Sequence, residues 1–189
     1  MTPHVRNTLL PAFVFAGALL MFILEPLVGR ILLPAYGGGF HVWTTCLMFF
    51  QGALLAGYLY AHFIAPRIGR WHLLVACAPL LLFPLNLTPA PDPDAPILSI
   101  LTVLLSCIAL PFGVLSTTGV LAQSWLASSE DGEGDPYWLY SASNAGSLLG
   151  LLAYPFVVEP WLGVSAQRWT WSACYLAYLA LAASVAPRA

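Results

Sequence analysis

The chain has very little charge and no lysine. Of its 189 residues only 7% are Asp, Glu, Lys or Arg, whereas 60% are hydrophobic. Soluble domains carry about 25% charged residues, so this composition excludes a soluble globular domain. The six cations are all arginines scattered along the chain, and the net charge is −2. Without a basic stripe, nucleic acid is excluded as a partner.

Catalytic and metal-binding motifs are also missing. The sequence has no G-x-S-x-G, H-E-x-x-H or phosphate-binding loop pattern. The four cysteines form no C-x-x-C pair, so we expect each of them to be a small buried hydrophobic residue. His62 and His72 flank a short connection but form no haem or metal motif, and the acidic segment 128–135 lacks the order of a calcium loop. We therefore expect no enzyme, no cofactor and no metal.

What the sequence has is a series of apolar runs. About 20 apolar residues cross the ~30 Å hydrocarbon core of a bilayer, and breaks at glycine, proline and charged residues divide the chain into segments of about this length. The predicted spans are Leu9–Leu33, Val42–Ala65, Trp71–Leu87, Ile97–Leu126, Tyr137–Val158 and Gln167–Val185. We predict an all-α integral membrane protein, a single domain over residues 1–189 built as a bundle of about six transmembrane helices.

The arginines predict an orientation. Six spans place Arg6, Arg67, Arg70 and Arg188 on one side of the membrane and Arg30 and Arg168 on the other. Because positively charged connections stay inside, we expect both termini to be cytoplasmic. The use of arginine in place of lysine hints at a bacterial source, which predicts the inner membrane.

Glu25 and Arg30 lie inside the first apolar run. An ionisable group costs roughly 2.5–3.5 kcal/mol there, so it normally faces a partner helix or a wet cavity. At 1.5 Å per residue, Glu159 and Arg168 fall in the same outer zone of the membrane. Two interpretations stay open. Either these residues form an ion-pair cluster, in which Glu25 pairs with Arg30 or Arg168, or Glu25 is a coupling carboxylate that faces a cavity.

Two amides fall near the middle of the membrane. By the same count Gln51 is in the centre of the second span and Asn144 in the fifth. An amide in hydrocarbon needs a partner within the bundle. We therefore expect both to form hydrogen bonds between helices.

Small residues predict close helix packing. In the fifth span Ser143, Gly146 and Gly150 lie on nearly one face, and two glycines four positions apart allow a close backbone approach. Gly52 begins a weaker pattern of this kind in the second span. We expect the second and fifth spans to pack against each other.

Several segments together resemble a known family. They are Leu24–Pro34 (LEPLVGRILLP), Val42–Cys46 (VWTTC), Gly57–His62 (GYLYAH), Leu115–Gly119 (LSTTG) and Asp135–Gly150 (DPYWLYSASNAGSLLG), followed by Tyr154-Pro and Glu159-Pro. In this order they resemble the membrane half of bacterial spermidine synthase-like membrane proteins, often described as fused MFS/spermidine synthase. In that family a multi-helix membrane region precedes a cytosolic domain similar to aminopropyltransferases.

The resemblance implies the membrane module without its catalytic domain. The sequence contains no Gly-rich nucleotide loop with a downstream acidic residue before it ends at Ala189. Aminopropyl transfer is therefore carried over to no residue of this chain.

Three functional hypotheses follow. The favoured one is a non-catalytic membrane anchor or structural subunit that docks to other membrane subunits, to a second copy or to a separate soluble enzyme. The second is a small transporter or permease for a polar or cationic solute, with Glu25, Glu159 and Asn144 along its path. The third is a haem- or quinone-binding membrane subunit that uses His62 or His72.

Overall fold

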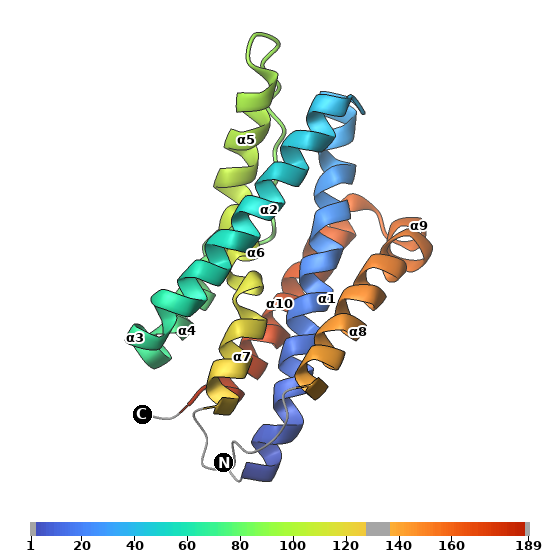
Figure 1. Ribbon diagram of the computed structural model, residues 1–189. Coiled ribbons are helices and arrows are strands. Elements are labelled where there is room, and N and C mark those ends of the chain that lie inside the picture. Colours follow the sequence, from blue (N-terminus) through green and yellow to red (C-terminus); the bar gives the residue numbers. More distant parts are fainter. Residues whose placement is uncertain (1–2, 128–136, 188–189) are drawn as a thin grey trace.

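The computed structural model describes residues 3–127 and 137–187, most of which are helical (Figure 1). The α-helices are α1 (Pro3–Tyr36), α2 (Phe40–Phe63), α3 (Ala65–Ile68), α4 (His72–Cys77), α5 (Pro96–Cys107), α6 (Ala109–Ser116), α7 (Thr118–Ala127), α8 (Tyr137–Ala153), α9 (Glu159–Trp161) and α10 (Val164–Val185). Two 3-10 helices, η1 (Gly69–Trp71) and η2 (Ala78–Leu82), flank α4, and a π-helical turn, η3 (Tyr154–Val158), follows α8. No strand occurs among these residues, which confirms the all-α prediction. The acidic segment 128–135 and Arg188 lie outside the described residues.

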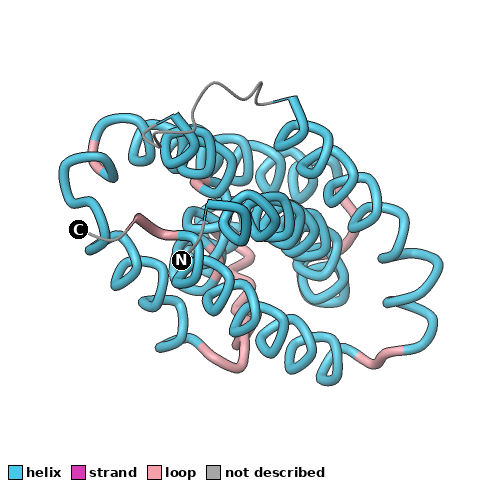
Figure 2. Tube along the Cα trace, turned by 90° about the horizontal axis from the view of Figure 1, so that it is seen from below, coloured by secondary structure: helices cyan, strands magenta, loops and turns pink. Residues whose placement is uncertain are grey.

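The central helix of the bundle is α1. It contacts α8, α10, α6, α7 and α2, and the view along the bundle shows the other helices arranged around it (Figure 2). Phe13, Leu24, Leu27 and Leu32 of this helix are almost completely buried. A helix that is apolar on several faces is typically covered on several sides, which explains this position.

Three helical segments are long and apolar enough to cross a membrane. They are Thr8–Tyr36, Phe40–Phe63 and Tyr137–Trp161. The segments Pro96–Cys107 and Ala109–Ala127 could form a fourth span, although they meet at an angle of 62°. This bend, within the predicted fourth span, precedes Pro111, which lacks a backbone N–H and whose ring clashes with the carbonyl group four residues earlier.

The predicted count of six spanning helices is therefore not confirmed. Where a helix was predicted over Trp71–Leu87, the chain forms only η1, α4 and η2 and then runs without regular helix from Phe83 to Ala95. Pro79 and Pro84 remove backbone donors from this stretch, and three further prolines follow before Ala95. In place of the predicted sixth span α10 forms, but it is not among the candidate spans of the described residues.

The long segments run in two opposite directions. In Figure 1, α1 and α8 run upward, whereas α2, the series α5 to α7, and α10 run downward. One end of the bundle, which we call the terminal end, therefore contains the first residues of α1 and α8 and the last residues of α7 and α10. The chain enters α5 at the opposite end.

Candidate functional site

Three consecutive hydroxyl side chains mark the junction between α6 and α7. Ser116, Thr117 and Thr118 each donate a hydrogen bond to the carbonyl oxygen three residues earlier, over 2.7, 2.7 and 2.6 Å. Hydroxyl groups that bond the backbone in this way compete with the regular helix, and the helix is interrupted at Thr117. No functional role was predicted for this Ser-Thr-Thr run, which contributed only to the family resemblance. A run of hydroxyls in an apolar helix was the signal that could have found it.

A polar cavity of about 420 Å³ lies beside this junction. Its wall is built from α1, α2, α6, α7 and α8, and its apolar part includes Ala18, Met21 and Phe22 of α1. Six other side chains give it polar character: Tyr58, Gln123, Tyr140, Ser143, Asn144 and Ser147. We call this space the polar groove. The structure brings the predicted residues Ser143 and Asn144 together here.

The six polar side chains of the groove have no hydrogen-bond partner within the described residues. Ser116 and Thr118 also line the groove, but their hydroxyls are already bonded to the backbone. Amides and hydroxyls can both donate and accept hydrogen bonds. The groove therefore directs free donors and acceptors from three helices, α2, α7 and α8, toward one space.

Two glycines hold α8 beside the groove by packing it closely on α1. A Cβ atom on Gly146 would collide with the carbonyl oxygen of Phe15, and one on Gly150 would lie 2.8 Å from the carbonyl oxygen of Leu19. Close packing was predicted at both positions, but the main neighbour of α8 is α1, and the prediction of α2 as that neighbour is wrong. Gly52 of α2 is exposed, with no atom within 4 Å of an added Cβ.

Glu25 lies on the face of α1 that lines the groove. It follows Phe22 by three positions and Met21 by four, so it occupies the same side of the helix one turn further on. Helical side chains lean toward the N-terminus of their helix, so we expect the Glu25 carboxylate to reach back toward the turn that contains Met21 and Phe22. Within the described residues Glu25 forms no hydrogen bond or ion pair. The predicted pairing of Glu25 with Arg30 or Arg168 is therefore wrong.

Both of these arginines have other partners. Nη1 of Arg30 donates to the carbonyl oxygen of Glu159 at 3.0 Å, and its Nε lies 3.8 Å from Oε1 of the same residue. Arg168 donates from Nε to the carbonyl oxygen of Leu85 and from Nη2 to Oδ1 of Asn86, the latter over 2.8 Å. The first interaction connects α1 to α9, and the second holds the segment after η2 against α10.

Gln51 is exposed at the middle of α2. It precedes Tyr58 by seven positions, or two helical turns, and so lies on the side of α2 that faces the groove. Neither Gln51 nor Asn144 forms a hydrogen bond within the described residues. The predicted bonds between helices are absent there.

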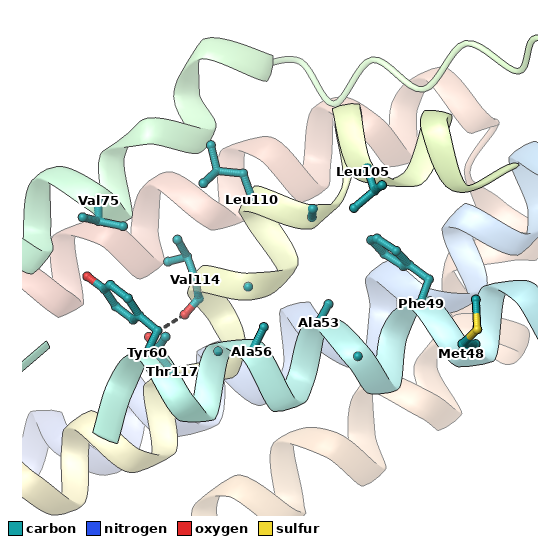
Figure 3. Close-up of a pocket in the computed structure, with 14 residues that line it drawn as sticks. Met48, Phe49, Ala53, Ala56, Tyr60, Val75, Leu105, Leu110, Val114 and Thr117 are labelled. Atoms are coloured by element: carbon teal, nitrogen blue, oxygen red, sulfur yellow. Dashed lines mark hydrogen bonds between the residues drawn. The ribbon is translucent and has the colours of Figure 1, made fainter. Parts of the chain in front are cut away.

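A second cavity, of about 480 Å³, is apolar (Figure 3). Its two hydroxyl groups are already engaged. Oγ1 of Thr117 bonds the carbonyl oxygen of Val114 at 2.7 Å, and the hydroxyl of Tyr60 lies 3.0 Å from Nδ1 of His72. His62 packs edge-on against Phe63, and the described residues contain no group of three metal-ligating side chains. The polar groove is thus the stronger candidate for a functional site.

Comparisons with models of protein families, with curated proteins and with solved structures found no match. Function is therefore inferred from the polar groove and its surroundings.

Proposed function

We propose that this chain is a multi-pass membrane protein that binds a small polar solute in the polar groove and acts as a transporter or permease. The observation that carries the proposal is the set of six partnerless polar side chains, within the described structure, around one space of about 420 Å³. In hydrocarbon, a polar group without a partner costs several kcal/mol. A solute with its own donors and acceptors would remove that cost.

Interrupted helices support the same function. Non-helical backbone at membrane depth is tolerated where it is buried in protein or lines a wet cavity, and transporters commonly build their binding sites from discontinuous helices. Here the series α5 to α7 is interrupted at Ile108 and Thr117, and α8 continues into the π-helical turn η3. A passive anchor would require none of these interruptions.

A second candidate function, a docking subunit, is favoured by the exposed amide of Gln51 in α2. Gln51 is exposed and without a partner among the described residues, in a helix that is apolar enough to span a membrane. A helix of another membrane protein could satisfy such an amide. The partner would be another membrane subunit, a second copy of this chain or a separate soluble enzyme.

For either function we place the protein in a bacterial inner membrane with the terminal end in the cytoplasm. Arg67 lies in α3 and Arg70 in η1, close to that end of the bundle (Figure 1). Positively charged connections are retained in the cytoplasm, which supports this orientation.

Thermal unfolding in detergent tests the transport function. A solute that binds the folded state raises the melting temperature. We expect a panel of small polar solutes to contain one that stabilises the wild type but not Ser147→Leu, which fills the groove. Ala173→Leu, on an exposed position of α10, is the matched control. Solutes that pass this test are then assayed for uptake into proteoliposomes.

The docking function predicts a different result. The protein would purify from mild detergent in a stoichiometric membrane complex, Gln51→Leu would weaken that complex, and no solute would change the melting temperature. That combination would show the transport function to be wrong.

A further inference from the structure

Glu25 lies one helical turn beyond Met21 and Phe22 on the same face of α1, next to the end of the polar groove that is away from the terminal end. Met21 and Phe22 line the groove, and because helical side chains lean toward the N-terminus of their helix, we expect the Glu25 carboxylate to reach back toward their turn. A carboxylate in a membrane segment needs a cation, a proton or water beside it. Within the described residues it has no protein partner.

The arginines that could neutralise Glu25 are placed elsewhere. Arg30 binds Glu159, and Arg168 binds the segment after η2. Arg70 lines a cavity together with Leu9, and Leu9 is 16 residues, roughly 24 Å along α1, from Glu25. None of these three arginines is in a position to supply the missing charge.

The groove also contains uncharged polar side chains, and Ser147 is the one whose distance from the Glu25 carboxylate can be derived from the helix packing. A Cβ atom on Gly150 would lie 3.2 Å from Cβ of Phe22, so these two residues stand at the same level of the parallel helices α1 and α8. Glu25 lies three residues beyond Phe22 and Ser147 three residues before Gly150, which separates them by roughly 9 Å along the bundle. This separation suits a short carbon chain with a polar group at each end.

Building on the proposed transport function, we infer that the groove binds a small organic cation. Its ammonium group pairs with the carboxylate of Glu25, and its uncharged polar end bonds Ser147 and Asn144. A hydrogen bond to a charged group contributes more than one between neutral groups. Glu25 therefore makes the groove select a cation over a neutral molecule of the same size.

Two small test ligands of the same size distinguish the effect of ligand charge from the effect of ligand shape. 4-Amino-1-butanol carries an ammonium group at neutral pH, and 1,4-butanediol has a hydroxyl group of the same size in its place. Binding of each to the purified full chain in detergent is titrated by saturation-transfer NMR. We expect the wild type to bind the amino alcohol about tenfold more tightly or better. Glu25→Gln should bind both compounds equally, with the affinity of the wild type for the diol.

Glu159→Gln is the matched control, because it removes a carboxylate that pairs with Arg30 outside the groove. We expect this variant to keep the preference for the amino alcohol. Ser147→Leu should weaken the binding of both compounds, because it fills the space that they share.

The possible results distinguish the two proposals. Equal binding of both compounds by the wild type, lost in Ser147→Leu, would overturn the cation proposal and leave the transport function standing. Failure of the wild type to bind either compound would overturn the cation proposal, and the wider solute panel then decides the transport function. A preference that persists in Glu25→Gln would assign the selectivity to another group. The wild-type comparison needs no variant to fold.

Discussion

The hydroxyl of Tyr178 in α10 lies 2.8 Å from Oγ1 of Thr118 at the start of α7. Both side chains are buried, and Thr118 already donates its proton to the carbonyl oxygen of Leu115 at 2.6 Å. Tyr178 must therefore be the donor and Thr118 the acceptor. This hydrogen bond fastens the interrupted α6–α7 junction, and with it one wall of the polar groove, to α10.

The direction of this hydrogen bond predicts unequal effects of removing its two members. Tyr178→Phe removes the donor but leaves Thr118 bonded to Leu115, so we expect a loss of about 1 kcal/mol in the free energy of unfolding. Thr118→Val leaves the buried hydroxyl of Tyr178 without an acceptor and should cost about 1–3 kcal/mol. Denaturant unfolding in detergent measures both values.

Ser184→Ala is the control for this pair, because it removes an exposed hydroxyl that bonds only within its own helix. We expect no measurable change there. A larger loss for Tyr178→Phe than for Thr118→Val would contradict the assigned donor and acceptor.

The contact between α8 and α1 gives a second prediction, with a control in the same chain. Leucine at Gly146 or Gly150 would collide with backbone carbonyl groups of α1, and overpacking of this kind costs about 1–3 kcal/mol or more. A Cβ atom added at Gly52 has no atom within 4 Å. We expect the first two variants to melt at clearly lower temperatures than the wild type and Gly52→Leu to melt with it. Equal melting of all three would show that α8 does not approach α1 closely.

Some of this structure could be predicted from the sequence, because length and hydropathy suffice for an isolated helix. They predicted α1, α2 and α8, and the glycine spacing predicted a closely packed face on α8.

The predicted ion pair between Glu25 and Arg30 was wrong for a specific reason. Counting the rise per residue gives a level along the helix but no direction around it, and five positions between Glu25 and Arg30 correspond to a rotation of roughly 140°. Side chains separated in this way do not face each other.

The polar groove was harder to predict, because its residues come from separate helices. Tyr58, Gln123 and Ser147 are single polar residues in apolar segments, and nothing in the sequence relates one to another. Only the packing of α8 on α1 and the break at Thr117 bring them to one space. The predicted third span does not form one continuous helix, because apolar composition was counted and the backbone donors lost at proline were not.

The two bonds of Arg168 predict how the segment after η2 is held. Arg168 binds the carbonyl oxygen of Leu85, and Ser172, one turn further along α10, accepts a hydrogen bond from the backbone N–H of Leu85 at 3.3 Å. Arg168→Met should cost about 1.5–3 kcal/mol, because hydrogen bonds from a charged donor are lost. Arg168→Lys should lose part of this, since a single ammonium group cannot reproduce the planar fork of arginine.

Hydrogen exchange of the amide of Leu85 reports directly on this attachment. We expect faster exchange in Arg168→Met than in the wild type, and no change in Arg67→Met, which removes an exposed arginine of α3. Unchanged exchange at Leu85 in both variants would mean that Ser172 alone holds the segment.

The path of the chain predicts which connections share a side of the membrane. Both α1 and α10 have their free ends at the terminal end, whereas the chain enters α5 at the opposite end (Figure 1). If the stretch from α4 to Ala95 crosses the membrane, partly as helix and partly as extended chain, a reporter inserted at Asp92 must lie on the outer side. A reporter fused after Ala189 must then lie in the cytoplasm, where the arginine bias places the terminal end. Should the reporter at Asp92 be cytoplasmic, the stretch from α4 to Ala95 would not cross the membrane, and this path of the chain through the membrane would be wrong.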